Sequence, residues 1–361
     1  MAKHLANKGY KVILAMPPDE SLLSLGIHDE GFHIALRDYL NTLDEFRNAG
    51  FIVPHYEKIY TIANINGSPR FYFKRDSDWT SYGAKFTAEL ISSELDSLNV
   101  IDKSSAVNFV TRRVGWLKNR GHFINSSSDP CYGNYAPEFT ELFNTTPVTD
   151  NSIPNSNVFL IGTGRSVANT YNFDGFLKEK LKTNITNYTD DDGDIVTGWY
   201  NFLFSLKKDL DARGLIVWEL PYEKRELSSS FFRSVLAGLY SDCESKHILN
   251  TSGVFSGLHF EKRYEMFLTK NISLNEKEDL LFNIGFVGPY INGVTVRLWF
   301  DDGGYFDVKM KSHIRSNDLK FILGNAIYKY KKNIFAIDVK LTDSKEKDMF
   351  ANVNVCLIDV N

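Results

Sequence analysis

Two short stretches of the sequence combine residue types that could perform acid–base or nucleophilic chemistry. The first places the carboxylates Asp76 and Asp78 on either side of Ser77, just ahead of an amphipathic segment. The second, residues 162–166 (Gly-Thr-Gly-Arg-Ser), directly follows an apolar run. A serine hydroxyl becomes a nucleophile only with a base within hydrogen-bonding distance. The two stretches therefore matter chemically only if the fold brings them together.

The apolar pattern around these stretches predicts alternating strands and helices. Strands are expected at residues 10–16, 51–54, 157–161 and 215–220, and helices at 30–49, 83–98 and 173–182. This alternation is typical of a parallel sheet covered on both faces, which places ligand-handling groups at the carboxyl ends of its strands. Residues 121–157, rich in Asn, Ser, Thr and Pro, predict a long surface loop.

The pattern changes near residue 250. Period-2 runs separated by Gly, Asn and Asp turns follow one another without intervening helices, which predicts a β-sandwich. We therefore expect an α/β domain over residues 1–248 and an all-β sandwich over residues 249–361.

Composition excludes several classes of protein. The 361 residues are 43% hydrophobic and 24% charged, as in ordinary globular chains, and 41 basic against 45 acidic side chains give no reason to expect a nucleic-acid partner. No apolar run approaches the roughly 18 residues of a membrane helix. The chain opens almost directly on a predicted strand, so we expect that an upstream portion with an export signal is missing.

The two stretches resemble the SGNH-hydrolase-like domain of the alginate O-acetyltransferase family AlgX/AlgJ. The family pattern Asp-x-His-Trp-(Thr/Ser)-x-x-Gly-Ala is matched by Asp76, Trp79, Thr80, Gly83 and Ala84. The patterns Gly-Thr-Ser-x-Ser and Asn-Phe-x-Gly-x-Leu are matched in part by residues 162–166 and fully by residues 172–177. The resemblance covers nearly the whole chain and implies a three-layer α/β domain followed by a carbohydrate-binding β-sandwich.

The resemblance implies a Ser–His–Asp triad, of which this chain keeps one member. The aspartate is Asp76, but Asp78 stands at the histidine position and Gly164 at the serine position. Glycine offers no nucleophile, and a carboxylate with an ordinary pKa near 3.9 is a poor base. We predict that catalysis is weak or lost. A shifted nucleophile at Ser166, the second serine of the motif, remains an alternative.

Other chemistry in the first domain is less well supported. Ser77 lacks the strand and glycine that precede a hydrolase serine, and no pattern ties the histidines to the site (His28, His33, His55 and His122). Asp76 and Asp78 lack the further ligand that a metal or glycosidase site needs. The acidic run at 190–194 lacks the distal glutamate of a calcium loop. We expect no metal ion and no cofactor.

The β-domain carries the predicted ligand site. Arg297 and Trp299 stand at i and i+2 of a predicted strand, so they share one face, where an arginine could bind sugar carboxylates and an indole the flat sugar faces. The resemblance adds Arg263 as a further basic ligand. The alternative is that Trp299 belongs to the core and Arg297 to the surface.

The three cysteines, Cys131, Cys243 and Cys356, leave two interpretations open from the residues alone: buried free thiols, or one disulfide and an orphan. The resemblance implies a Cys243–Cys356 disulfide and a partner for Cys131 upstream of Met1. A disulfide would place the protein in the periplasm, an oxidising compartment.

These observations predict a periplasmic protein of exopolysaccharide biosynthesis and O-acetylation that binds an anionic, alginate-like polymer. One alternative is an active O-acetyltransferase that works through Ser166 with a rearranged triad. Another is a scaffold that recruits other polysaccharide biosynthesis or export proteins.

Overall fold

A computed structural model describes the chain in two compact units, residues 2–226 and 227–361. The described residues are 1–24, 30–57, 59, 70–74, 76–101, 106–119, 137–148, 157–167, 171–189, 195–206, 213–227, 229–239, 247–256, 264–272, 278–287, 293–311, 318–322, 332–341 and 348–359.

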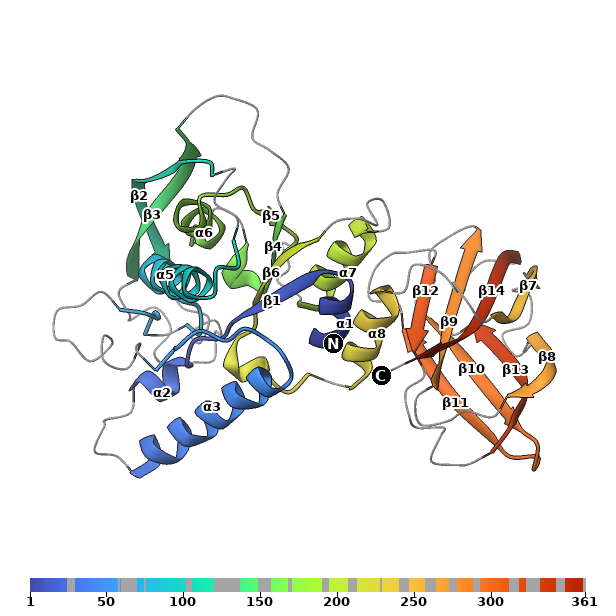
Figure 1. Ribbon diagram of the computed structural model, residues 1–361. Coiled ribbons are helices and arrows are strands. Elements are labelled where there is room, and N and C mark those ends of the chain that lie inside the picture. Colours follow the sequence, from blue (N-terminus) through green and yellow to red (C-terminus); the bar gives the residue numbers. More distant parts are fainter. Residues whose placement is uncertain are drawn as a thin grey trace. The chain divides into compact units, whose positions relative to one another are not determined.

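The first unit is built on a four-stranded parallel sheet (Figure 1). Its strands are β1 (Tyr10–Ala15), β4 (Val158–Ile161), β5 (Thr186–Asn187) and β6 (Gly214–Glu219), in the order β1-β6-β4-β5. Residues of β1, β4 and β6 are almost all buried, as expected for strands covered on both faces. The parallel sheet predicted from the apolar runs is confirmed.

Helices cover both faces of this sheet. They are α1 (Ala2–Asn7), α2 (Glu20–Ser24), α3 (Glu30–Asn48), α5 (Ser81–Ser97), α6 (Phe173–Leu181) and α7 (Ile195–Leu206). In Figure 1, α5 and α6 lie on one side of the sheet and α7 on the other. Trp199 of α7 packs edge-on against Trp218 of β6, with ring centroids 5.4 Å apart. The three predicted helices correspond to α3, α5 and α6.

Part of the predicted surface loop is a strand. An antiparallel hairpin joins β2 (Phe109–Asn119) and β3 (Glu138–Pro147), so the loop expected over residues 121–157 is wrong for 138–147. Both strands are mostly part-exposed, and their polar residues hide the period-2 pattern. Residues 51–54, expected as a strand, contribute only an isolated bridge between Ile52 and Ile13.

The second unit is the predicted β-sandwich. One antiparallel sheet has the order β11-β10-β13-β8 and the other β12-β9-β14-β7. The strands are β7 (His247–Ser256), β8 (Tyr264–Ile272), β9 (Glu278–Val287), β10 (Gly293–Phe300), β11 (Tyr305–Lys311), β12 (Asp318–Ile322), β13 (Ile334–Leu341) and β14 (Asp348–Asp359). Along β10, alternate residues from Val294 to Phe300 are buried, as a half-covered strand requires.

Helix α8 (Ser229–Leu239) belongs to the second unit, so the two units divide between Glu226 and Leu227, upstream of the predicted boundary at 248/249. Ala237 of α8 packs with Leu281 of β9 and Ile358 of β14 in one apolar cluster. This contact covers Leu281, which lies on the opposite face of β9 from Leu280 and Phe282. Among the described residues, no helix is both long and apolar enough to cross a membrane.

Candidate functional site

The carboxyl ends of β4 and β6 meet at a buried carboxylate, Glu219, the last residue of β6. One of its oxygens, Oε2, accepts hydrogen bonds from the Thr163 N–H at 2.6 Å, the Thr163 hydroxyl at 2.8 Å and the Ser166 hydroxyl at 3.2 Å. Complete burial raises the pKa of the Glu219 carboxyl, and the Arg165 charge and these donors oppose the rise. Glu219 thus holds the turn after β4 in place.

The same turn requires Gly162. A Cβ at that position would lie 2.5 Å from the Ser166 hydroxyl oxygen and 2.7 Å from Glu219 Oε2, closer than packed atoms allow. After Gly162, residues Gly164–Ser166 form a short 3₁₀ turn, capped by the Thr163 side chain. The motif residues Gly162 and Thr163 therefore shape the turn.

Arg165 joins the two stretches singled out in the sequence. Its side chain is 4% exposed, and Nη2 donates to the Ser77 carbonyl at 2.5 Å and to Glu223 Oε1 at 2.6 Å. Its Nε lies 3.9 Å from Asp78 Oδ1. In return, the Trp79 indole N–H donates to the Arg165 carbonyl at 3.0 Å. The fold thus brings residues 76–80 and 162–166 together, as the sequence required for any shared chemistry.

Asp78, at the histidine position, is tied to its surroundings. Its Oδ2 accepts the Tyr171 hydroxyl at 2.8 Å, and burial together with the Asp78 charge raises the pKa of Tyr171 far above its ordinary value. Asp76 is 2% exposed; it accepts the Asp78 N–H at 3.2 Å and the Asn119 amide at 3.1 Å. Both carboxylates therefore have donors, and the Arg165 guanidinium lies beside Asp78.

Gly164 and Ser166 differ sharply in their surroundings. A Cβ built on Gly164 would have no heavy atom within 4 Å, so a side chain there would enter open space. Ser166 is 1% exposed, its hydroxyl donates to Glu219, and its carbonyl accepts the Asn187 amide at 2.8 Å. The accessible position thus has no side chain, and the serine that remains is enclosed.

The other retained motif residues position the first stretch. Thr80 caps α5: its hydroxyl oxygen accepts the Gly83 N–H at 3.3 Å and donates to the Arg70 carbonyl at 2.5 Å. A Cβ on Gly83 would collide with the Phe71 carbonyl and with Trp79. Trp79 is fully buried and packs on Phe173, the first residue of α6, with centroids 4.8 Å apart.

In the second unit, Arg297 and Trp299 lie together on one face of β10. Arg297 forms a bidentate ion pair with Asp307 of β11, through Nε at 2.6 Å and Nη2 at 2.7 Å. Its guanidinium also lies 3.7 Å from the centroid of the Tyr305 ring. The Trp299 indole donates to Asp338 Oδ2 at 2.8 Å and packs beside Tyr305, which is 55% exposed. The face is aromatic and partly open, although Arg297 already has a carboxylate partner.

Several predicted residues lie outside the described part of the chain. Arg263, Cys131 and Cys243 are among them, so the role of Arg263 and the Cys243–Cys356 pairing stay predictions. Cys356 is buried on β14. Within the described residues, no group of three or more His, Cys, Asp or Glu side chains is arranged to hold a metal ion.

Sequence reasoning missed the main partners within the site. The sequence patterns assign no role to Glu219, Glu223 or Tyr171, and the family motif leaves the position of Arg165 unspecified. A signal did exist for Glu219, because a carboxylate that ends a wholly apolar strand must find donors when it is buried.

The sheet order, the turn after β4 and the sandwich that follows define an SGNH-hydrolase-like protein with a β-sandwich module. The solved structure of Pseudomonas aeruginosa AlgX matches 99% of this chain and 86% of its own, with a TM-score of 0.77 at 19% identity. The O-acetyltransferase domain of Pseudomonas putida AlgJ matches 67% of this chain and 87% of its own, with a TM-score of 0.51 at 23% identity. The predicted fold class is confirmed.

The sequence profile described as "SGNH hydrolase-like domain, acetyltransferase AlgX" matches residues 1–222, and the chain therefore belongs to the AlgX family. The alginate biosynthesis protein AlgX of Pseudomonas fluorescens is 24% identical over 319 residues, which are 84% of this chain and 65% of that protein. The probable alginate O-acetylase AlgJ of P. aeruginosa is 24% identical over 238 residues, covering 61% of this chain and 60% of AlgJ. The predicted family is confirmed, and the chain spans about two thirds of the curated AlgX relative.

Proposed function

We propose that this protein binds an anionic polysaccharide during exopolysaccharide biosynthesis and O-acetylation, and does not itself transfer acetyl groups through a serine. The relatives are named for alginate biosynthesis and O-acetylation, which supports a polyuronate of that kind as ligand. A periplasmic location and a Cys243–Cys356 disulfide are part of the proposal, and the two go together because structural disulfides form and persist in oxidising compartments.

The absence of a side chain at Gly164 is the main observation that supports this proposal. The side-chain position that the family motif gives to a serine opens into free space, yet no side chain fills it. The position that the motif gives to a histidine holds Asp78, whose carboxylate already accepts the Tyr171 hydroxyl and lies beside Arg165. Neither a nucleophile nor a base is available where the motif would place them.

One observation favours a second candidate, an acetyltransferase that uses Ser166. The Ser166 hydroxyl donates to Glu219, and the raised pKa of Glu219 makes that carboxylate a better base than an ordinary one. Against this, Ser166 is 1% exposed, and Glu219 Oε2 also accepts two shorter hydrogen bonds from Thr163. An acyl donor has no room to reach the hydroxyl, so binding without catalysis is the better supported function.

The test pairs binding with turnover on the same preparation. Calorimetric titration with an oligouronate prepared from alginate should give saturable binding, and a neutral cello-oligosaccharide of equal length should bind more weakly. Hydrolysis of 4-nitrophenyl acetate should not exceed the rate of a Ser166→Ala variant. Saturable binding together with Ser166-dependent hydrolysis would favour the second candidate, whereas no binding to either oligosaccharide would favour a scaffold for polysaccharide-export proteins.

A further inference from the structure

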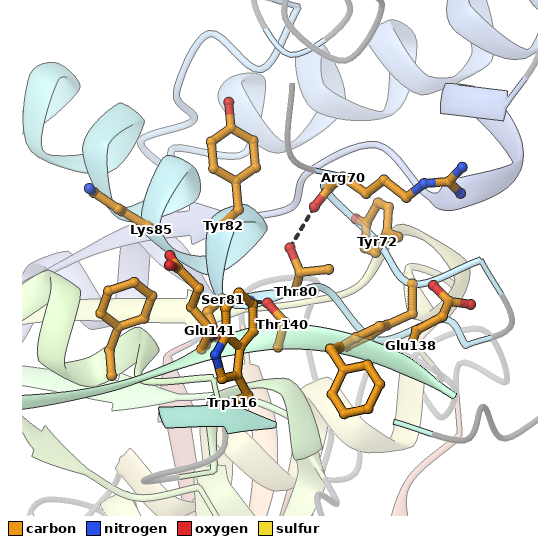
Figure 2. Close-up of a pocket in the computed structure, with 13 residues that line it drawn as sticks. Arg70, Tyr72, Thr80, Ser81, Tyr82, Lys85, Trp116, Glu138, Thr140 and Glu141 are labelled. Carbon is orange, nitrogen blue, oxygen red and sulfur yellow. Dashed lines mark hydrogen bonds between the residues drawn. The ribbon is translucent and has the colours of Figure 1, made fainter. Parts of the chain in front are cut away.

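The first unit contains a pocket of about 450 Å³ beside the hairpin β2–β3, lined by residues before α5, the start of α5 and residues of both hairpin strands. Its volume is within the range of about 300–1,000 Å³ that is common for small-molecule sites. Figure 2 shows Arg70 and Lys85 on opposite sides of this pocket, with Trp116 below them. None of the residues discussed for the degenerate triad lines it, apart from Thr80, which caps α5.

The pocket has an aromatic wall that faces solvent. Trp116 of β2 is 60% exposed and Phe139 of β3 is 58% exposed, an unusual degree of exposure for two large apolar side chains close together. The strand register pairs Trp116 with Glu141 and Lys118 with Phe139, which places Trp116 and Phe139 on one face of the hairpin. Tyr82, in the first turn of α5, also lines the pocket. Flat aromatic faces of this kind suit the C–H faces of sugar rings.

The lining holds two acids and two cations, and the cations are the side chains left available to a ligand. The two acids are already engaged: Glu141 pairs with Arg113 at 3.1 Å, and Glu138 accepts the Lys74 N–H at 2.9 Å. The two cations, Arg70 and Lys85, are exposed, and neither forms a salt bridge with another described residue. The Arg113 guanidinium, which pairs with Glu141, also lies 5.5 Å from the centroid of the Trp116 ring.

The walls of the pocket are fixed to each other. The Ser81 hydroxyl donates to the Glu141 carbonyl at 2.6 Å, and the Ser81 N–H donates to the Thr140 hydroxyl at 3.3 Å. These bonds join the start of α5 to β3. The Thr80 hydroxyl donates to the Arg70 carbonyl, which joins the segment before α5 to the same end of that helix. The pocket is therefore formed before any ligand arrives, which reduces the entropy lost on binding.

From these observations we infer that the pocket is a binding subsite for a segment of an acidic polysaccharide, with sugar rings against Trp116 and Phe139 and carboxylates toward Arg70 and Lys85. This inference rests on the proposed function, since the ligand is of the same class. It adds a second binding surface, in the first unit, to the one predicted on β10.

The experiment measures oligouronate binding to the full chain by calorimetry and by tryptophan emission. Trp116→Ala should weaken binding about tenfold, the loss that corresponds to about 1.4 kcal/mol. Trp116→Phe should keep most of the affinity and lose the part of the emission change that comes from Trp116, because the aromatic face remains but that indole does not. Lys85→Gln should weaken binding at low salt and reduce its dependence on salt.

Val114→Ala is the matched control, because Val114 is 59% exposed on the same strand but does not line the pocket. If the parent chain binds and the Trp116→Ala and Lys85→Gln variants bind as tightly as the control, the pocket is not a subsite, although the proposed function stands. If the parent binds no oligouronate, both the proposed function and this inference are wrong. Concentration-dependent self-association that Trp116→Ala abolishes, with oligouronate affinity unchanged, would instead assign the aromatic wall to contact with a second copy.

Discussion

The turn after β4 and the pocket beside the hairpin lie in the same unit, yet they differ in almost every physical property. At the turn, Arg165, Glu219 and Ser166 are buried and bound to other protein groups. At the pocket, Trp116, Phe139 and Lys85 are exposed. The first arrangement is enclosed and holds the turn after β4 in place, whereas the second leaves its aromatic and cationic side chains exposed to a ligand. In this chain, the site of the family's catalytic motif has the features of a structural element.

The largest effect is expected at Glu219. Replacing it by Ala removes the shared acceptor of the Thr163 N–H, the Thr163 hydroxyl and the Ser166 hydroxyl, and leaves buried donors unpaired. We expect a loss of about 3 kcal/mol or more in the free energy of unfolding of the first unit. Urea denaturation followed by tryptophan emission measures it, because four of the five tryptophans lie in residues 2–226.

Glu223→Ala is the control for that prediction. Glu223 also contacts Arg165, but its side chain is 38% exposed, so its loss should cost much less. Equal costs for the two variants would show that burial is not what makes the Glu219 contacts important.

The second prediction concerns the face of β10. Arg297→Ala combined with Trp299→Ala should weaken oligouronate binding about tenfold, by removing a charge and an aromatic surface. The unfolding of the first unit should not change. Lys332→Ala is a matched control, since Lys332 pairs with Asp302 at 2.6 Å in the same unit without touching Arg297. Unchanged affinity in the double variant would leave Arg297 as a structural partner of Asp307 alone.

A smaller effect is expected at Thr80. Thr80→Ala removes the cap of α5 and should destabilise the first unit by about 1 kcal/mol. Thr80→Ser keeps the hydroxyl and should restore most of that loss. If the serine variant is as unstable as the alanine variant, the methyl group rather than the cap accounts for the role of Thr80 in the motif.

The smallest effect is a dependence on pH. Because burial raises the pKa of Glu219 in the folded state, the folded protein binds its proton more tightly than the unfolded chain does. The contribution of Glu219 to stability is therefore complete below its unfolded pKa and is lost as pH rises through the folded pKa. Relative to Glu219→Gln, the parent should lose stability between about pH 4 and neutrality. A difference that is constant over this range, or that favours the parent at higher pH, contradicts the assignment.

Sequence patterns predicted the elements that are buried on both faces. β4 is an uninterrupted apolar run, β1 is broken only by Lys11, and β6 is apolar up to Glu219. The helices α3 and α5 have clear helical spacing, so local pattern was enough to predict all of these elements. The hairpin β2–β3 was missed because its strands are half exposed and carry polar residues with Trp116 facing outward. The pocket forms where β3 pairs with β2 and contacts α5. Contacts between segments that are distant in the sequence produce no periodic pattern within any one segment.

The sequence predicted which residues belong to the candidate site but not which residues they contact. Asp76, Asp78, Gly164 and Ser166 could be aligned to a motif, whereas the partners that decide their chemistry come from elsewhere in the chain. The Tyr171 hydroxyl donates a hydrogen bond to Asp78, and the Ser166 hydroxyl donates one to Glu219. Whether a retained serine is accessible depends on packing around the turn, which a single sequence does not encode locally.

The most direct test of the central claim is the rate of 4-nitrophenyl acetate hydrolysis by the parent chain and by a Gly164→Ser, Asp78→His double variant. Gly164→Ala with Asp78→His is the matched control, since it fills the same open space without a hydroxyl. We expect the parent and the control to be inert and the double variant to gain serine-dependent turnover. Turnover by the parent that Ser166→Ala abolishes would contradict the account, because the enclosed serine would then be the working nucleophile.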